Sequence, residues 1–164
     1  MGRVRFRQAR AWDAKAILKI KQAAIDSIET GEYTAEQLDA WRPDDDAIGD
    51  FRRAIRSDRF VILLAEDDGE PAGYGVLNTK MNRIDAIFIH PDHTGEGIAS
   101  SLVKQFETRA QMQELPEITI VSSMNARSFY QSLDYWDFGT KTRTINGIEI
   151  EFAIMRKIFS FNTP

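Results

Sequence analysis

The fold of this chain is decided by residues 84–102, which read IDAIFIHPDHTGEGIASSL. The stretch begins with an apolar run of strand length that ends at His90-Pro91-Asp92. A turn with two glycines follows, and beyond it apolar side chains recur every four residues, at Ile98, Leu102, Phe106 and Ala110. This spacing places them on one face of a helix. The stretch therefore predicts a strand over 83–90, a tight turn, and a helix from about 97 to 113.

The turn has the chemistry of an anion-binding site. Gly95 and Gly97 let the backbone bend sharply and approach a ligand without side chains in the way. The N–H groups of residues 95–100 are predicted to point outward at the helix start, where unpaired donors and the helix dipole bind a pyrophosphate. Ala99 and Ser100 are small and keep the approach open. Taken alone, however, the two glycines fit an ordinary strand-to-helix turn equally well.

Further strands and helices surround this stretch. Apolar runs and apolar–polar alternation predict strands at 4–7, 60–65, 72–78, 117–122, 136–144 and 148–157. Helices are predicted from Asp13 to a cap at Gly31, from an N-cap at Thr34 to Trp41, and over 44–56 and 125–133. Asn146-Gly147 is a strong signal for a tight hairpin turn. The order predicts a mixed α/β (α+β) fold, with a largely antiparallel central sheet of about seven strands flanked by helices.

Composition narrows the class of protein. The 164 residues fit one domain spanning 1–164, and 43% apolar with 28% charged residues is a globular balance. The absence of cysteine excludes disulfides, thiolate metal sites and a thiol nucleophile. A net charge of −4 argues against nucleic acid as a general partner. No apolar run approaches about 20 residues, so we expect a cytoplasmic protein with no membrane partner.

The residues of the turn resemble a known signature. The run from Thr94 to Ala99 is similar to the acyl-CoA motif of the GNAT acetyltransferases, usually written Arg/Gln-x-x-Gly-x-Gly/Ala. The later stretch from Asn125 to Leu133 resembles the second conserved block of that family, a short helix that carries Asn and Tyr. The order of elements matches the GNAT fold over nearly the whole chain. The pattern from Tyr33 to Trp41 further resembles a YafP-like branch.

The resemblance implies an N-acetyltransferase that uses acetyl-CoA as co-substrate and needs no metal. In the family, one central strand splays from its neighbour and binds the cofactor through free backbone groups, and an N–H there stabilises the carbonyl oxygen. Here strand 87–89 would splay from strand 119–122. The implied cofactor-binding residues are Ile87, Phe88, Ile89, Thr94, Gly95, Glu96, Gly97, Ile98, Ala99, Ser100, Asn125 and Tyr130.

The resemblance also implies catalytic roles. Tyr130 would protonate the departing thiolate, because the pKa of a phenol, about 10, is close to that of the thiol. In isolation, Tyr130 fits a core aromatic residue better. Asp85 is the first candidate base, directly or through water, and a structural or solvated role is equally compatible with its sequence context. Glu29, Glu32 and Ser122 are weaker candidates.

Tyr33 and Trp41 are predicted either to wall the acceptor pocket or to pack the helix pair onto the sheet. The resemblance implies a small-molecule or peptide amine as acceptor. Paired sheet edges or the final hairpin could support a homodimer. Because His90 and His93 flank Pro91, a helix cannot hold both on one face, and no metal site is expected.

Two residues depart from the family pattern. Thr94 stands where Arg or Gln is usual, so we expect weaker cofactor binding carried mainly by backbone donors. Asp134 stands where Gly often ends the Tyr-bearing helix, and Asp tolerates the left-handed conformation better than most residues. These departures leave room for an alternative function, a catalytically silent domain that binds acyl-CoA as a sensor or regulator. Intact Asn125 and Tyr130 favour the enzyme.

Overall fold

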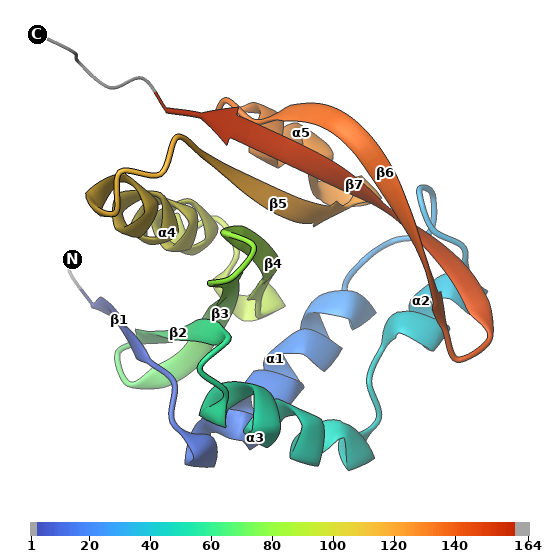
Figure 1. Cartoon of the computed structure of the whole chain (residues 1–164). Coiled ribbons are helices and arrows are strands. Elements are labelled where there is room, and N and C mark those ends of the chain that lie inside the picture. The colour runs from blue at the N-terminus through green and yellow to red at the C-terminus, as the bar shows by residue number, and fades with distance from the viewer. Residues whose placement is uncertain (1–2, 160–164) are drawn as a thin grey trace, which may run out of the picture.

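We describe the fold from a computed structural model of the chain, which covers residues 3–159. Within them, seven strands form one sheet in the order β1-β2-β3-β4-β5-β7-β6 (Figure 1). All neighbouring strands are antiparallel except the β4–β5 pair, which is parallel. The strands are β1 Val4–Gln8, β2 Phe60–Asp67, β3 Glu70–Asn78, β4 Arg83–Ile89, β5 Glu117–Ser123, β6 Trp136–Ile145 and β7 Ile148–Ile158. The predicted fold class is confirmed.

The helices cover both faces of the sheet. α1 and α3 lie on one side of the β2–β4 region and α4 lies on the other (Figure 1). The α-helices are α1 Ala14–Asp26, α2 Ala35–Trp41, α3 Ile48–Arg56, α4 Ile98–Met112 and α5 Arg127–Gln131. Short 3-10 turns are η1 Ala11–Asp13, η2 Asp45–Ala47, η3 Pro91–His93 and η4 Met124–Ala126. None of the helices within residues 3–159 combines the length and apolar character that a membrane crossing requires.

One helix cap was predicted correctly and another was wrong. Thr34 caps α2, since its hydroxyl accepts from the Gln37 N–H while the Gln37 side chain accepts from the Thr34 N–H. The first helix, however, ends at Asp26, and Ser27 is its C-cap. Gly31 does not have the positive φ of a capping glycine and lies in the loop that follows.

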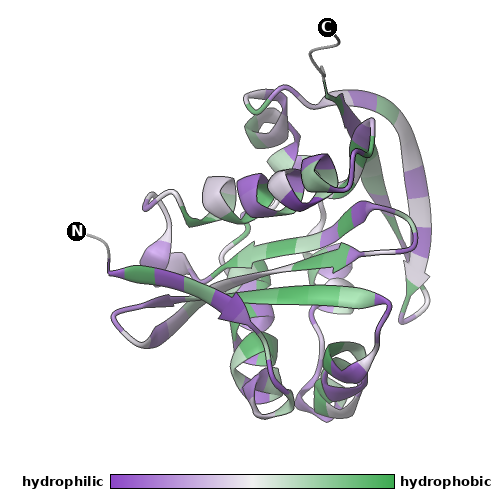
Figure 2. Cartoon of the chain, turned by 60° about the vertical axis from the view of Figure 1, so that its left-hand side comes forward, coloured by the Kyte–Doolittle hydropathy of each residue, from purple (hydrophilic) through white to green (hydrophobic). Residues whose placement is uncertain are grey.

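Two glycines on β3 bring α4 close to the sheet. A side chain at Gly75 would come within 2.8 Å of Phe106 on α4, and one at Gly73 within 2.6 Å of the Ile89 side chain. Phe106 is buried, together with much of the apolar stripe predicted for α4. The central strands are correspondingly apolar (Figure 2). Close packing of α4 fixes the position of the turn that precedes it.

A bulge in β4 shapes the region between the two halves of the sheet. Val76 pairs with Ala86 and Leu77 pairs with Ile84, so Asp85 is an extra residue with no partner on β3. In a regular strand, residues three apart point to opposite faces of the sheet, because successive side chains alternate. The bulge changes this alternation, so Ile84 and Ile87 both contact the core under α4. Asp85 is thereby set apart from the pleat of the strand.

Candidate functional site

A cleft opens where β4 leaves β5. The two parallel strands pair only at Arg83 with Thr119 and at Ile84 with Ile120. Beyond Ile84, β4 stays paired with β3 on one side and has no strand on the other. The predicted splay of residues 87–89 from residues 119–122 is therefore confirmed. An open strand edge in the middle of a sheet leaves backbone groups free to bind a ligand.

The free backbone donors of β4 face this cleft. The His90 N–H donates to the Ala72 carbonyl on β3 at 2.8 Å. Because N–H groups alternate in direction along a strand, those of Ile87 and Ile89 point away from β3 and into the opening. A cavity of about 90 Å³ lies there. Its lining comes from eight elements: Lys21, Trp41, Asp85, Ala86, Ile87, Phe88, Val121, Ser122, Ser123, Ala126, Tyr130, Arg143 and Phe152.

The glycine turn before α4 forms a second hollow beside the cleft. Gly95 and Gly97 have φ values of +80° and +77°, and Gly97 is the N-cap of α4. The first helical amide that is bonded is that of Ser101, which donates to the Gly97 carbonyl. None of the N–H groups of residues 95–100 donates a hydrogen bond to another described residue. The hollow measures about 350 Å³ and is lined by Ile89, His93, Thr94, Gly95, Gly97, Ile98, Ala99, Ser100 and Phe129.

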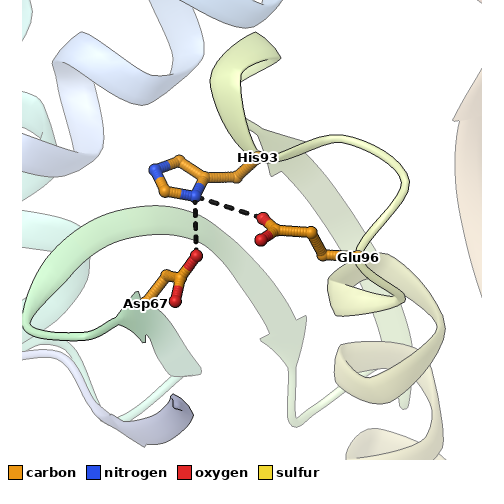
Figure 3. A group of neighbouring side chains, drawn as sticks. All are labelled: Asp67, His93 and Glu96. Atoms are coloured by element: carbon orange, nitrogen blue, oxygen red, sulfur yellow. Dashed lines mark hydrogen bonds and ion pairs between the residues drawn. The ribbon is translucent and has the colours of Figure 1, made fainter. Parts of the chain in front are cut away.

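Side chains tie the turn to the rest of the protein. The Thr94 hydroxyl donates to the Pro91 carbonyl, and the Asp92 N–H donates to Nδ1 of His90. His93 Nδ1 lies 3.2 Å from Oδ2 of Asp67, at the end of β2, and 3.2 Å from Oε2 of Glu96 in the turn (Figure 3). This contact links the turn to a strand that is remote in sequence, so the free amides are held in place.

The cluster of Asp67, His93 and Glu96 was missed by sequence reasoning, which considered only the two histidines together and expected no metal site. Its three potential ligand atoms lie within 4.8 Å of one another. Nδ1 carries at most one proton, so it can donate to only one carboxylate fully at a time. An imidazole and two carboxylates are groups that divalent metals accept. No local sequence pattern indicates this cluster, because strands β3 and β4 lie between Asp67 and His93.

Tyr130 lies on α5 at the base of the cleft. It is buried, belongs to the core cluster under α4 and also lines the cavity, so both sequence interpretations describe its environment. Its hydroxyl forms no hydrogen bond with another described residue. Burial raises the pKa of the Tyr130 phenol above its usual value, which keeps the proton on the oxygen at neutral pH. Asp134 has φ +72°, so it adopts the left-handed turn that the family pattern gives to glycine.

Asp85 lies in the cleft because of the bulge in β4. Its Oδ1 accepts from Nε of Arg83 at 2.5 Å, and both side chains are mostly buried. Oδ2 accepts no hydrogen bond from the described residues. One carboxylate oxygen thus serves a structural ion pair while the other is available to a ligand or water.

The predicted acceptor residues separate into one that lines the cleft and one that does not. Trp41 lines it, with its ring 5.7 Å from that of Phe88 and 5.6 Å from that of Phe152. Tyr33 lies behind Trp41, and its hydroxyl donates to the Glu151 carbonyl and accepts from the Met124 N–H. Of the two predicted roles, Tyr33 therefore has the packing role and does not line the cleft.

Asn125 and Glu96 contribute side chains to neither hollow. Asn125 is exposed and borders a separate recess with Glu32 and Arg127. The Glu96 side chain turns toward His93 instead of the hollow before α4. For Glu96, only the backbone remains a candidate for the predicted cofactor contact.

Lys21 and Arg143 line the cleft and were not predicted. Lys21 comes from α1 and Arg143 from the distant strand β6. Burial first, and the charge of Arg143 second, lower the pKa of Lys21 to about 8. Lys21 had a detectable signal, since it lies four residues from both Ile17 and Ile25 on the apolar stripe of its helix. Arg143 had none, because it lies on a strand of mixed polar residues.

A mixed sheet split between β4 and β5, with a glycine turn opening a helix beside the split, defines an acetyltransferase of the GNAT type. Comparison with known families agrees, since a model described as an acetyltransferase (GNAT) domain matches residues 29–159. The chain belongs to the GNAT acetyltransferase family.

Individual proteins support the same assignment. The N-acetyltransferase YafP of Escherichia coli is 23% identical over 131 residues, covering 80% of each chain. A GCN5-related N-acetyltransferase from Rhodopseudomonas palustris superposes with a TM-score of 0.87 at 27% identity, covering 97% of this chain and 98% of that one. The PaiA N-acetyltransferase of Thermoplasma acidophilum, solved with coenzyme A, has a TM-score of 0.73 at 18% identity over 95% and 99% of the chains.

Proposed function

We propose that this chain is an acetyl-CoA-dependent N-acetyltransferase that moves the acetyl group directly to an amine of a small molecule or peptide in a ternary complex. The observation that carries the proposal is the row of unpaired N–H groups at residues 95–100, next to a cleft lined by Tyr130 and Asp85. The coenzyme A found in the PaiA structure supports the cofactor class.

The residues of the turn fit the pyrophosphate of coenzyme A. Amides at the start of a helix bind phosphate through N–H donors and the helix dipole. Side chains built at Gly95 and Gly97 would meet no atom within 4 Å, so the space in front of the amides is open. Thr94 brings no charge, and backbone donors would carry most of the binding. The N–H groups of Ile87 and Ile89 would bond the pantetheine arm along the edge of β4.

The cleft supplies the groups that acyl transfer requires. Bound acetyl-CoA supplies a thioester carbonyl that a neutral amine can attack. An N–H of residues 87–89 would stabilise negative charge on the carbonyl oxygen. Asp85 would take the proton of the amine through its free oxygen or through water, and Tyr130 would give a proton to the departing sulfur. An Asp85→Asn variant tests the base, because an unshifted pH–rate profile would assign the proton to another group.

The decisive experiment separates an enzyme from a cofactor sensor. Thiol release from acetyl-CoA is followed across a panel of small amines and peptides, and coenzyme A binding is measured by calorimetry on the same protein. We expect micromolar to millimolar cofactor binding together with amine-dependent thiol release. Binding without release on any amine would favour the sensor. Failure of the folded protein to bind coenzyme A would overturn both functions.

A further inference from the structure

Two cationic side chains line the cleft without a carboxylate partner among residues 3–159. They are Lys21 on α1 and Arg143 on β6. Elsewhere in the described chain, six of the other thirteen arginines form salt bridges with acids, namely Arg7, Arg42, Arg53, Arg83, Arg127 and Arg156. The remaining arginines outside the cleft are exposed to solvent, whereas Lys21 and Arg143 are half-buried at the cleft and have no acidic partner among the described residues.

The contacts of both cations are aromatic. Lys21 Nζ lies 5.3 Å from the ring centroid of Phe88 and 5.9 Å from that of Phe51. The Arg143 guanidinium lies 5.5 Å from the ring centroid of Phe152. Aromatic faces attract a cation weakly and accept few of its N–H donors. The contacts hold the two head groups at the cleft while leaving hydrogen-bond donors for another ligand.

The charge balance of the cleft is positive. Asp85 is the one acid among the described lining residues, and its Oδ1 is already bonded to Arg83. Lys21 and Arg143 repel each other, and the low dielectric of a partly closed site strengthens that repulsion. Burial and this repulsion lower the pKa of Lys21 to about 8. An anion bound near both groups would relieve the repulsion.

We propose that the acceptor is an amino carboxylate, an amine that also carries a carboxylate, and that this carboxylate binds between Lys21 and Arg143 while the amine faces Asp85. The proposal rests on the proposed function and names its substrate class. The planar fork of Arg143 matches a carboxylate, and a cavity of about 90 Å³ favours the smaller planar group over a tetrahedral phosphonate. Trp41 and Phe152 wall the same space and would contact the apolar part of the acceptor.

The test compares acceptors that differ only in the anionic group. Alanine, alaninamide and 1-aminoethylphosphonate form one set, and 4-aminobutanoate, 4-aminobutanamide and 3-aminopropylphosphonate form a longer one. The readout is the ratio of kcat/KM for the carboxylate to that for its carboxamide. In at least one set, we expect this ratio to favour the carboxylate and to fall about 10- to 100-fold in both Lys21→Met and Arg143→Gln. A higher kcat/KM for the phosphonate than for the carboxylate would overturn the choice of carboxylate.

Matched variants distinguish an anion site from a general effect of lost charge and from a catalytic base. Lys19→Met removes a lysine from the same helix that is exposed and near Asp45, and it should leave the ratio unchanged. Lys21→Arg keeps the positive charge and should restore most of the ratio. If Lys21→Arg abolished turnover with every amine, Lys21 would be a catalytic base, and its proposed role in binding the carboxylate would be overturned.

Binding is measured independently of turnover, by calorimetry of each carboxylate with the protein saturated by coenzyme A. Carboxylate binding that weakens in Lys21→Met supports the proposal. Thiol release that is equal for carboxylates and carboxamides would overturn the anion site and leave the acetyltransferase function standing. Absence of carboxylate binding to a protein that binds coenzyme A would also overturn the anion site, whereas absence of coenzyme A binding would overturn the function itself.

Discussion

Tyr130 is the residue on which the proposed proton transfer to sulfur depends. Tyr130 lines the cleft, and burial holds the pKa of the phenol above its usual value, so the oxygen carries the proton at neutral pH, as a proton donor must. Tyr130→Phe should lower kcat about 100-fold or more and leave the dissociation constant of acetyl-CoA nearly unchanged. Steady-state kinetics and calorimetry measure the two quantities separately.

Tyr135→Phe is the matched control for this prediction. Tyr135 is equally buried and packs 6.2 Å from the Tyr130 ring, but its hydroxyl donates to Glu107 and does not line the cleft. This variant should lose stability and keep its turnover. Equal losses of turnover in the two variants would assign Tyr130 to packing alone.

Lys21 gives the proposed acceptor preference a defined pH dependence. Burial and the charge of Arg143 lower its pKa to about 8, so Lys21 is charged below that pH and neutral above it. The preference for an amino carboxylate over its carboxamide should be largest below pH 8 and fall as the pH rises through 8. In Lys21→Arg the group stays charged, and the preference should stay flat over that range. Parallel profiles for the two proteins would contradict this.

Sequence reasoning found the residues of the turn and of α5, but not the cations of the cleft. Tyr130, Asp85 and the glycines lie in local patterns whose spacing carries information. Lys21 and Arg143 meet only through tertiary packing, and no local pattern joins residues on α1 and β6. Tyr33 was identified but could not be placed, because an aromatic residue that lines a pocket and one that packs behind it look the same in the sequence.

At the scale of elements, the start of α4 joins the fold to the chemistry. Gly97→Val places a side chain in the open space before the amides and strains a backbone with φ +77°. Gly147→Val imposes the same strain at φ +79° in the β6–β7 turn, also in open space. Both should cost about 1–2 kcal/mol of stability, but only Gly97→Val should abolish coenzyme A binding. Urea unfolding and calorimetry distinguish the two effects.

Unaltered cofactor affinity in a folded Gly97→Val protein would show that the phosphates bind elsewhere. The same result in Gly147→Val is the expected one, because that turn lies on the β6–β7 hairpin and contributes to neither hollow. Comparison of the two variants thus separates backbone strain from obstruction of the site.

The elements were predicted more completely than their irregularities. Hydrophobic periodicity placed all the strands and α4, because burial of one face determines both. The bulge at Asp85 could not be predicted, because it arises from the packing of both Ile84 and Ile87 against the core under α4. This packing is a tertiary feature. The end of α1 was placed too late, because Gly31 permits a cap without requiring one. The cleft depends on the bulge and on the short β4–β5 pairing, both of which are tertiary features.

At the scale of the whole molecule, the site lies where two halves of the sheet meet along a short contact. The half from β1 to β4 carries α1 and the glycine turn, and the half from β5 to β7 carries α5 and Arg143. Only two pairs of residues join β4 and β5 directly. The cores under α4 and around Phe152 complete the junction. A ligand in the cleft would contact both halves, so its binding should stabilise the molecule as a whole.

Tyr33 strengthens this junction from outside the cleft. Its hydroxyl donates to the Glu151 carbonyl on β7 at 2.5 Å and accepts from the Met124 N–H at 3.0 Å, so one side chain ties the loop after α1 to two elements of the second half. Tyr33→Phe should lower the free energy of unfolding by about 1–3 kcal/mol, because both backbone groups lose their partner. Urea unfolding measures this loss. Tyr74→Phe is the control, since the Tyr74 hydroxyl bonds to no other described residue, and that variant should be near neutral. Equal losses in the two variants would mean that removing a hydroxyl costs the same with or without its two hydrogen bonds, and that the bridge between the halves does not stabilise the fold.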